Sequence, residues 1–81
     1  MPVRAKFKCH SITEREGWNG VKLVRDVKLI PVTSGSDENK QFYAATPGGS
    51  VEIACANAEA AAQFVIGREY YVDFTPADGG A

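Results

Sequence analysis

The strongest constraint on the fold is the alternation of apolar and polar side chains at the start of the chain. Successive side chains of a β-strand point to opposite faces, so the pattern predicts a half-buried strand over residues 3–12. The apolar phase holds Val3, Ala5, Phe7 and Cys9, and the other phase is a basic stripe of Arg4, Lys6, Lys8 and His10. Such a strand must bury its apolar face against the rest of a short chain.

Length and composition place the sequence among small globular proteins. The chain has 81 residues, of which 44% are hydrophobic and 23% charged. These values are typical of one folded domain and argue against intrinsic disorder. We expect a single domain over residues 1–76 and a flexible polar tail over residues 77–81.

Turn and cap signals divide the rest of the domain. Asn19-Gly20 tolerates positive φ and predicts a tight turn before a second strand over residues 21–33. The apolar period of that strand shifts at Arg25-Asp26, which favours a β-bulge there. Pro31 cannot donate to a ladder, so the far end of this strand is expected at an edge. Residues 34–40 are polar and predict a solvated loop.

The second half of the chain predicts a hairpin, a helix and a last strand. Residues 41–46 and 50–56 are expected to pair through a type II turn at Pro47-Gly48-Gly49. Asn57 is a good N-cap for a short helix over residues 58–64, and residues 69–75 alternate as the last strand. The result is a mainly β fold, a small five-stranded antiparallel barrel of SH3-like order with one short helix before the last strand. An OB-like barrel, which places its helix one strand earlier, is the second choice.

The titratable residues do not form a recognisable catalytic set. Hydrolytic chemistry needs a nucleophile, a base and an orienting group brought together, and the only histidine, His10, lies among lysines. Cys9 and Cys55 are expected to be reduced and buried. With His10 they would make three zinc ligands, but CxxC spacing is absent and His10 faces away from Cys9. We therefore expect no enzymatic activity, no metal and no cofactor.

Three surface features could bind a partner. The first is the basic stripe, extended by Lys22 and Lys28 of the second strand, for which a solvated face that prevents edge pairing is the favoured alternative. The second is Trp18, either an exposed anchor or a side chain that folds over one end of the barrel. The third is the pair Tyr43 and Tyr71, in the outward phase of their strands, which either pack under the helix or the 34–40 loop or contact another subunit.

Residues 31–76 carry a set of short motifs that resembles a family of small proteins of tailed bacteriophages. The motifs are E-N-K-x-F over residues 38–42, A-T-P-x-G over residues 45–49 and Y-Y-V-D-F over residues 70–74. Asn39, Lys40, Thr46, Pro47 and Asp73 belong to this pattern. Where the pattern often has proline before the glycine, this chain has Val65-Ile66-Gly67, an apolar patch that a partner could cover. The resemblance implies a phage origin and assigns no functional residue.

These observations lead to three functional hypotheses. The first is a non-enzymatic structural or assembly protein, an accessory or decoration subunit of the virion head that binds a protein such as the major capsid protein and can self-associate. The second is a cytoplasmic phage effector that binds a host protein or a nucleotide signal to block defence. The third is a barrel that binds single-stranded nucleic acid, which the net charge of −1 disfavours. No apolar run could span a membrane and no signal peptide is recognised, so we expect the host cytoplasm and then the virion.

Overall fold

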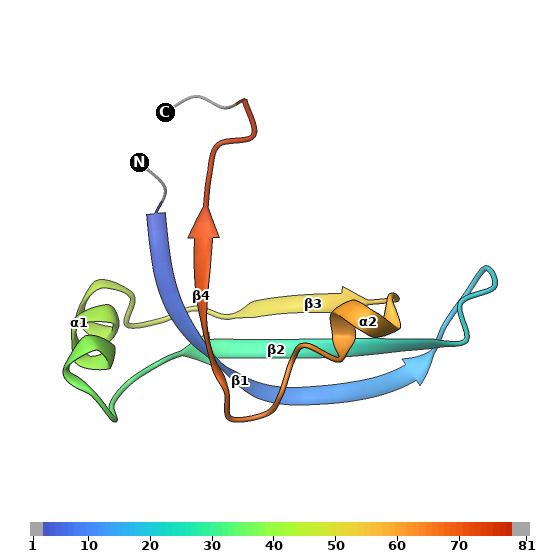
Figure 1. Ribbon diagram of the computed structural model, residues 1–81, viewed down its shortest axis with the longest axis horizontal. Coiled ribbons are helices and arrows are strands. Elements are labelled where there is room, and N and C mark those ends of the chain that lie inside the picture. Colours follow the sequence, from blue (N-terminus) through green and yellow to red (C-terminus); the bar gives the residue numbers. More distant parts are fainter. Residues whose placement is uncertain (1–2, 79–81) are drawn as a thin grey trace.

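The protein is a mainly β fold, a curled half-barrel of four antiparallel strands (Figure 1). The computed structural model describes residues 3–78. The strand order in the sheet is β3-β2-β1-β4. The elements in chain order are β1 (Val3–Glu16), β2 (Leu23–Pro31), α1 (Asp37–Ala45), β3 (Val51–Cys55), α2 (Ala58–Ala61) and β4 (Glu69–Phe74).

The long strand β1 belongs to two parts of the sheet. Its first residues, 3–8, pair with β4, and its residues from Phe7 to Glu16 pair with β2. The register with β2 shifts between Cys9 and Ser11, and such a bulge bends a strand (Figure 1). The bulge predicted at Arg25-Asp26 is wrong, because these two residues pair in regular register with β1 and β3. The bend needed to curl the sheet comes from β1 instead.

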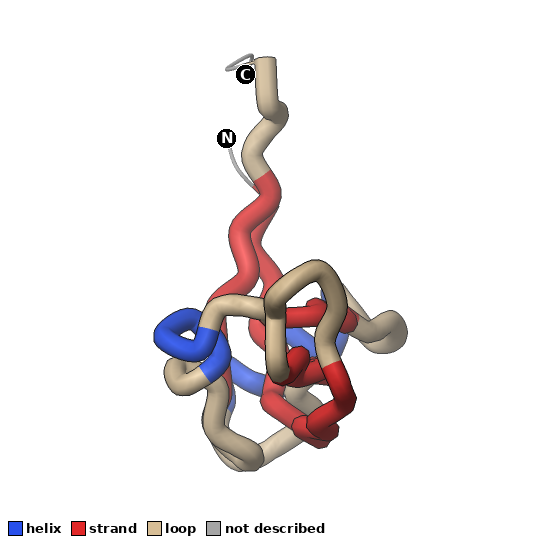
Figure 2. The backbone as a smooth tube through the Cα atoms, turned by 90° about the vertical axis from the view of Figure 1, so that its right-hand side faces the viewer, coloured by secondary structure: helices blue, strands red, loops and turns tan. Residues whose placement is uncertain are grey.

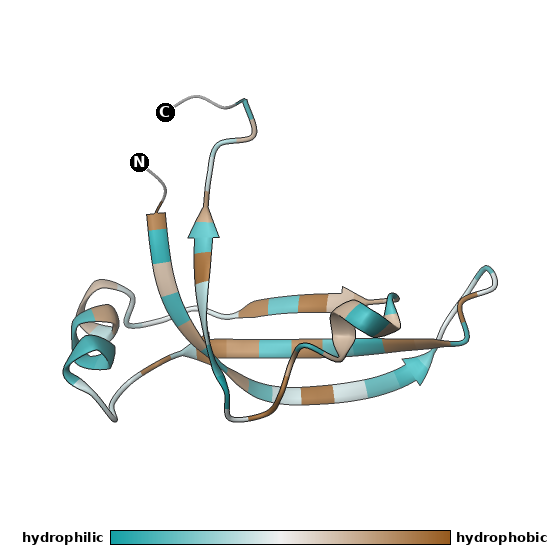
Figure 3. Ribbon diagram, in the orientation of Figure 1, coloured by the Kyte–Doolittle hydropathy of each residue, from teal (hydrophilic) through white to brown (hydrophobic). Residues whose placement is uncertain are grey.

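Residues 3–8 of β1 and the strand β4 form a two-stranded extension of the fold, which we call the arm. Figure 2 shows these paired strands leaving the body of the molecule, and Figure 3 shows apolar and polar residues alternating along β1 in this region. The radius of gyration is 14.6 Å and the extents are 43 × 34 × 19 Å. A compact chain of this length would have a radius of gyration of about 12 Å. The arm therefore leaves the molecule open and elongated.

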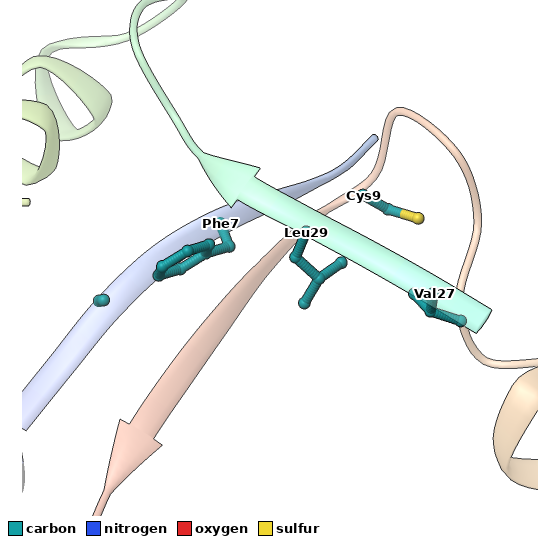
Figure 4. Close-up of a cluster of buried hydrophobic side chains, with 5 residues drawn as sticks. Phe7, Cys9, Val27 and Leu29 are labelled. Carbon is teal, nitrogen blue, oxygen red and sulfur yellow. The ribbon is translucent and has the colours of Figure 1, made fainter. Parts of the chain in front are cut away.

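The core lies on one face of the curled sheet. Phe7 and Cys9 of β1 and Val27 and Leu29 of β2 are buried there, together with Ala5 (Figure 4). Partly buried apolar side chains from the other elements complete the cluster: Ile12, Val51, Cys55, Phe64, Tyr70 and Val72. The alternation at the start of the chain thus buries Ala5, Phe7 and Cys9 as predicted, whereas Val3, at the beginning of the same phase, is 66% exposed. The basic phase lies on the opposite face.

The predicted strand over residues 41–46 is wrong, because these residues belong to α1 or its C-cap. The helix begins at Asp37, inside the predicted 34–40 loop, because the Ser36 hydroxyl accepts the Asn39 backbone N–H at 3.0 Å as an N-cap. The partner of β3 is therefore β2 and not residues 41–46. The described residues contain four strands and two helices instead of five strands and one helix, and the SH3-like and OB-like orders are not confirmed.

Several local predictions are confirmed. Asn19 and Gly20 have φ values of 48° and 86°, as the tight turn requires. Asn57 caps α2 by accepting two backbone N–H groups, although the helix ends at Ala61. The predicted last strand over residues 69–75 forms as β4 and ends at Phe74. Pro31 was expected at an edge, and it lies beyond Leu29, the last residue of β2 that pairs with β3. β1 continues to Glu16, beyond the predicted strand over residues 3–12. Of the predicted tail, residues 79–81 lie outside the described residues.

Candidate functional site

The outer face of the arm carries a polar cluster that joins α1 to both strands. We call its members the arm cluster: Arg4, Lys6, Glu38, Glu69, Tyr71 and Asp73. The Arg4 guanidinium donates to both carboxylate oxygens of Asp73, at 2.7 and 3.0 Å. The Lys6 ammonium lies 2.6 Å from a Glu38 oxygen and 3.4 Å from a Glu69 oxygen. The Tyr71 hydroxyl donates to Glu38 at 2.9 Å. Three carboxylates thus surround two cations.

These contacts change the ionisation of the cluster in consistent directions. The hydrogen bond from Arg4 lowers the pKa of Asp73, and the hydrogen bonds from Lys6 and Tyr71 lower the pKa of Glu38. Donation to Glu38 also raises the pKa of Lys6 and of Tyr71. The Arg4 guanidinium and the Lys6 ammonium lie 4.7 and 5.6 Å from the centre of the Tyr71 ring. Cation–π contact therefore adds to the ion pairs.

The arm cluster neutralises the first half of the predicted basic stripe. Two cations and three carboxylates give the cluster a formal charge of −1, although Arg4 and Lys6 alone contribute +2. The Lys6 side chain is only 12% exposed. Arg4 and Lys6 are therefore paired side chains, poorly placed to meet a second anionic surface at the same time.

Further contacts between α1 and β4 involve residues of the E-N-K-x-F and Y-Y-V-D-F segments and their neighbours. Asn39 of α1 is 2% exposed, and its amide donates to the Ser34 carbonyl and to Glu69, each at 2.8 Å. The rings of Phe42 and Tyr71 lie 6.1 Å apart. Residues of the E-N-K-x-F segment thus contact residues of β4. The motifs hold α1 against the arm, which gives them a structural role.

The second half of the stripe lines a hollow at the bend of β1. Lys8, Cys9 and His10 form one wall, and Ile30, Ile66 and Gly67 complete a volume of about 250 Å³. Lys8 and His10 are exposed, and Ile66 is 61% exposed. Cys9 is a free thiol whose burial raises its pKa, so it is poorly suited to act as a thiolate. The hollow combines cationic and apolar groups.

The remaining predicted binding residues are scattered over the surface. Trp18 is 51% exposed in the turn after β1, where the Arg15 guanidinium lies 5.3 Å from its ring centre. The exposed alternative for Trp18 is therefore the observed one. Lys28 of β2 lines a shallow hollow of about 350 Å³ that contains no residue of the arm, and Lys22 is exposed just before β2. Tyr43 is exposed on α1, so its predicted place on a strand is wrong. The structure does not bring these residues into one site.

The strand β4 has an exposed edge that the sequence pattern did not predict. Within residues 3–78, β4 pairs with β1 alone, so its other edge has no strand beside it. Val3 and Phe74, a register pair near the end of the arm, are 66% and 54% exposed. The alternation of residues 69–75 predicted the strand, but a local pattern contains no information about whether a strand is central or at an edge.

Two kinds of feature are absent from residues 3–78. No three His, Cys, Asp or Glu side chains of residues 3–78 gather as metal ligands. No helix in this range is long and apolar enough to cross a membrane. Comparison with protein-family models, with curated proteins and with solved structures found no match. The exposed side chains and strand edges of this chain are therefore the remaining guide to its function.

Proposed function

We propose that the protein is a non-enzymatic binding and assembly subunit whose partners are proteins. The observation that carries this proposal is the size of its surface. The chain exposes 5813 Å², whereas a compact monomer of 8.7 kDa exposes about 4,700 Å². An open half-barrel with this excess has surface that a partner would be expected to cover.

The kind of side chain on that surface supports a protein partner. Large apolar side chains are exposed on the arm, at the first turn and between α2 and β4, among them Trp18, Val65, Ile66 and Phe74. Aromatic side chains are enriched at the centres of protein interfaces. Protein interfaces have a polar rim, and the ion-paired side chains of the arm cluster are suited to such a rim. An apolar surface with neutralised charges favours proteins over polyanions.

The specific role that we propose is an accessory or decoration subunit of a phage virion head, bound to the major capsid protein in many copies. Support comes from the resemblance of residues 31–76 to small phage proteins. Repetition on a particle strengthens weak individual contacts, so a small domain with modest apolar patches suffices. Trp18 and the apolar pair Val65 and Ile66 are the anchors that we assign to the capsid contact, because they are exposed and do not belong to the arm cluster.

Quantitative mass spectrometry of purified particles tests this role. We expect a fixed ratio of this protein to the major capsid protein, unchanged by further density-gradient purification. A Trp18→Ala variant should reduce that ratio, whereas the matched surface variant Lys40→Ala, on the exposed face of α1, should leave it unchanged. Absence of the protein from particles, together with its abundance in infected cells, would exclude the virion role.

A second candidate is supported by the hollow at the bend of β1. Lys8 and His10 could meet a phosphate while Ile30 and Ile66 contact a base, which fits an effector that binds a nucleotide signal. A thermal-shift screen against linear and cyclic nucleotides tests it, since ligand at 100 times its Kd stabilises by about 2.7 kcal/mol. Lys8→Ala should abolish any shift and Lys40→Ala should not. Binding of single-stranded nucleic acid is disfavoured further, because Arg4 and Lys6 are already paired.

A further inference from the structure

The free edge of β4 lacks several features that protect an edge strand from pairing, and its two charged residues, Glu69 and Asp73, are held in ion pairs with Lys6 and Arg4. Its six residues, EYYVDF, contain no lysine and no proline, and their register with β1 has no bulge. Natural edge strands are blunted by such residues, by bulges or by a covering element. In Figures 1 and 2 the upper part of β4 projects from the body with only β1 beside it. A partner strand could therefore approach this edge.

The hydrogen-bond pattern identifies which backbone groups the edge presents. The Cys9 N–H donates to the Arg68 carbonyl at 2.9 Å, one step beyond the last register pair of β1 and β4. Hydrogen-bonded and non-hydrogen-bonded pairs alternate along an antiparallel ladder. Every second residue of β4 from Arg68 onward therefore bonds to β1. The N–H and C=O groups of Glu69, Tyr71 and Asp73 point toward the free edge.

We propose that this edge pairs antiparallel with the same edge of a second copy, about a two-fold axis at Val72. The two registers that satisfy the backbone pattern and pair most of β4 are centred on Tyr71 and on Val72. The Tyr71 register places Glu69 opposite the partner's Asp73, and like charges opposite each other are destabilising. The Val72 register instead places Asp73 opposite the partner's Tyr71. The edge is therefore self-complementary in one register, and two half-barrels join into one continuous sheet of eight strands.

The side chains of the Val72 register support a second copy as the occupant. Val72 faces the partner's Val72, and Tyr70 faces the partner's Phe74. Aromatic and β-branched cross-strand pairs are favourable. Phe74, which is 54% exposed in one chain, gains an aromatic neighbour, and the carboxylates of the arm cluster remain paired with their own cations. An isologous contact of this kind is the commonest form of protein dimer.

This inference deepens the proposed assembly function and names a second copy as one of its partners. Sedimentation velocity on the full chain at micromolar concentrations tests it, and we expect a dimer. Phe74→Lys should shift the population to monomer by at least tenfold in Kd, because two added ammonium groups come close to the two-fold interface. Ile66→Lys, the matched change at an exposed apolar residue outside the arm, should leave the dimer intact. A monomer at all concentrations, or a dimer broken only by Ile66→Lys, would overturn the proposal.

Cysteine cross-linking tests the register independently of any loss of folding. In a Cys55→Ser background, Val72→Cys should form an intermolecular disulfide on mild oxidation, because residues at a non-hydrogen-bonded pair approach to about 4.5 Å between Cα atoms. Tyr71→Cys should cross-link much less. Preferential cross-linking at Tyr71 would refute the Val72 register. A dimer of a protein that is absent from particles would leave this inference standing and exclude only the virion role.

Discussion

The replacement of Asn39 by alanine is expected to destabilise the protein by about 2 kcal/mol. The Asn39 amide makes one hydrogen bond to the neutral Ser34 carbonyl and one to the Glu69 carboxylate. Such bonds contribute about 1 kcal/mol and about 1.5 kcal/mol respectively, with the lower end used for the carboxylate because Glu69 is 38% exposed. The higher helix propensity of alanine returns about 0.6 kcal/mol. The net loss corresponds to a decrease in Tm of about 8–16 °C.

Thermal unfolding followed by circular dichroism measures this change, with urea unfolding as a second route to the free energy of unfolding. Gln41→Ala is the matched control, because Gln41 is an exposed residue of the same helix. It should change stability by no more than about 0.5 kcal/mol. An Asn39→Ala protein as stable as the control would refute the reasoning, because α1 would then not be held to the arm through this side chain.

The remaining predictions concern the first turn and the ion pairs. Gly17→Ala should destabilise by about 1–3 kcal/mol in urea unfolding, because its Cβ would lie 2.1 Å from the Val21 carbonyl oxygen. Gly48→Ala, where a Cβ would meet nothing within 4 Å, is the control and should be neutral. The pKa values of Glu38 and Asp73 are lowered from 4.5 and 3.8, so their ion pairs stabilise the fold above those values. That stability is lost as pH falls through the folded-state pKa values, so Tm should begin to decrease below about pH 4.5, by a small amount because both carboxylates are exposed. A Tm that is constant down to pH about 3 would contradict this assignment.

The elements that could be predicted from the sequence are those whose signals are local. The alternation of residues 3–10 identifies β1 and its buried face, because the period of a strand is a property of the strand itself. The turn at Asn19-Gly20 and the cap at Asn57 depend on the conformations that those residues prefer. Each of these predictions needs no knowledge of a distant residue.

The helix α1 shows where that approach fails. Ser36 followed by acidic residues is a readable N-cap signal, but the Phe-Tyr-Ala-Ala run after it suggested a strand. The helix is also held to β4 by a hydrogen bond between residues 30 positions apart, from Asn39 to Glu69, which no local pattern reveals. The prediction of a basic stripe also missed a long-range contact, the pairing of its cations with carboxylates. Arg4 and Asp73 are 69 positions apart, and their pairing follows only from the register of β1 with β4.

The bend in β1 connects these findings. Because one strand pairs with β4 before the bulge and mainly with β2 after it, four strands are enough to curl the sheet, and no fifth strand is needed to cover the core. The same bend directs β4 away from the body, so that its outer edge is bare and its outer face must be stabilised locally by α1 and the arm cluster. A closed barrel would have abolished both edges. This open form leaves an edge whose backbone groups are free to pair with another strand, and for that reason we propose that the protein functions in assembly.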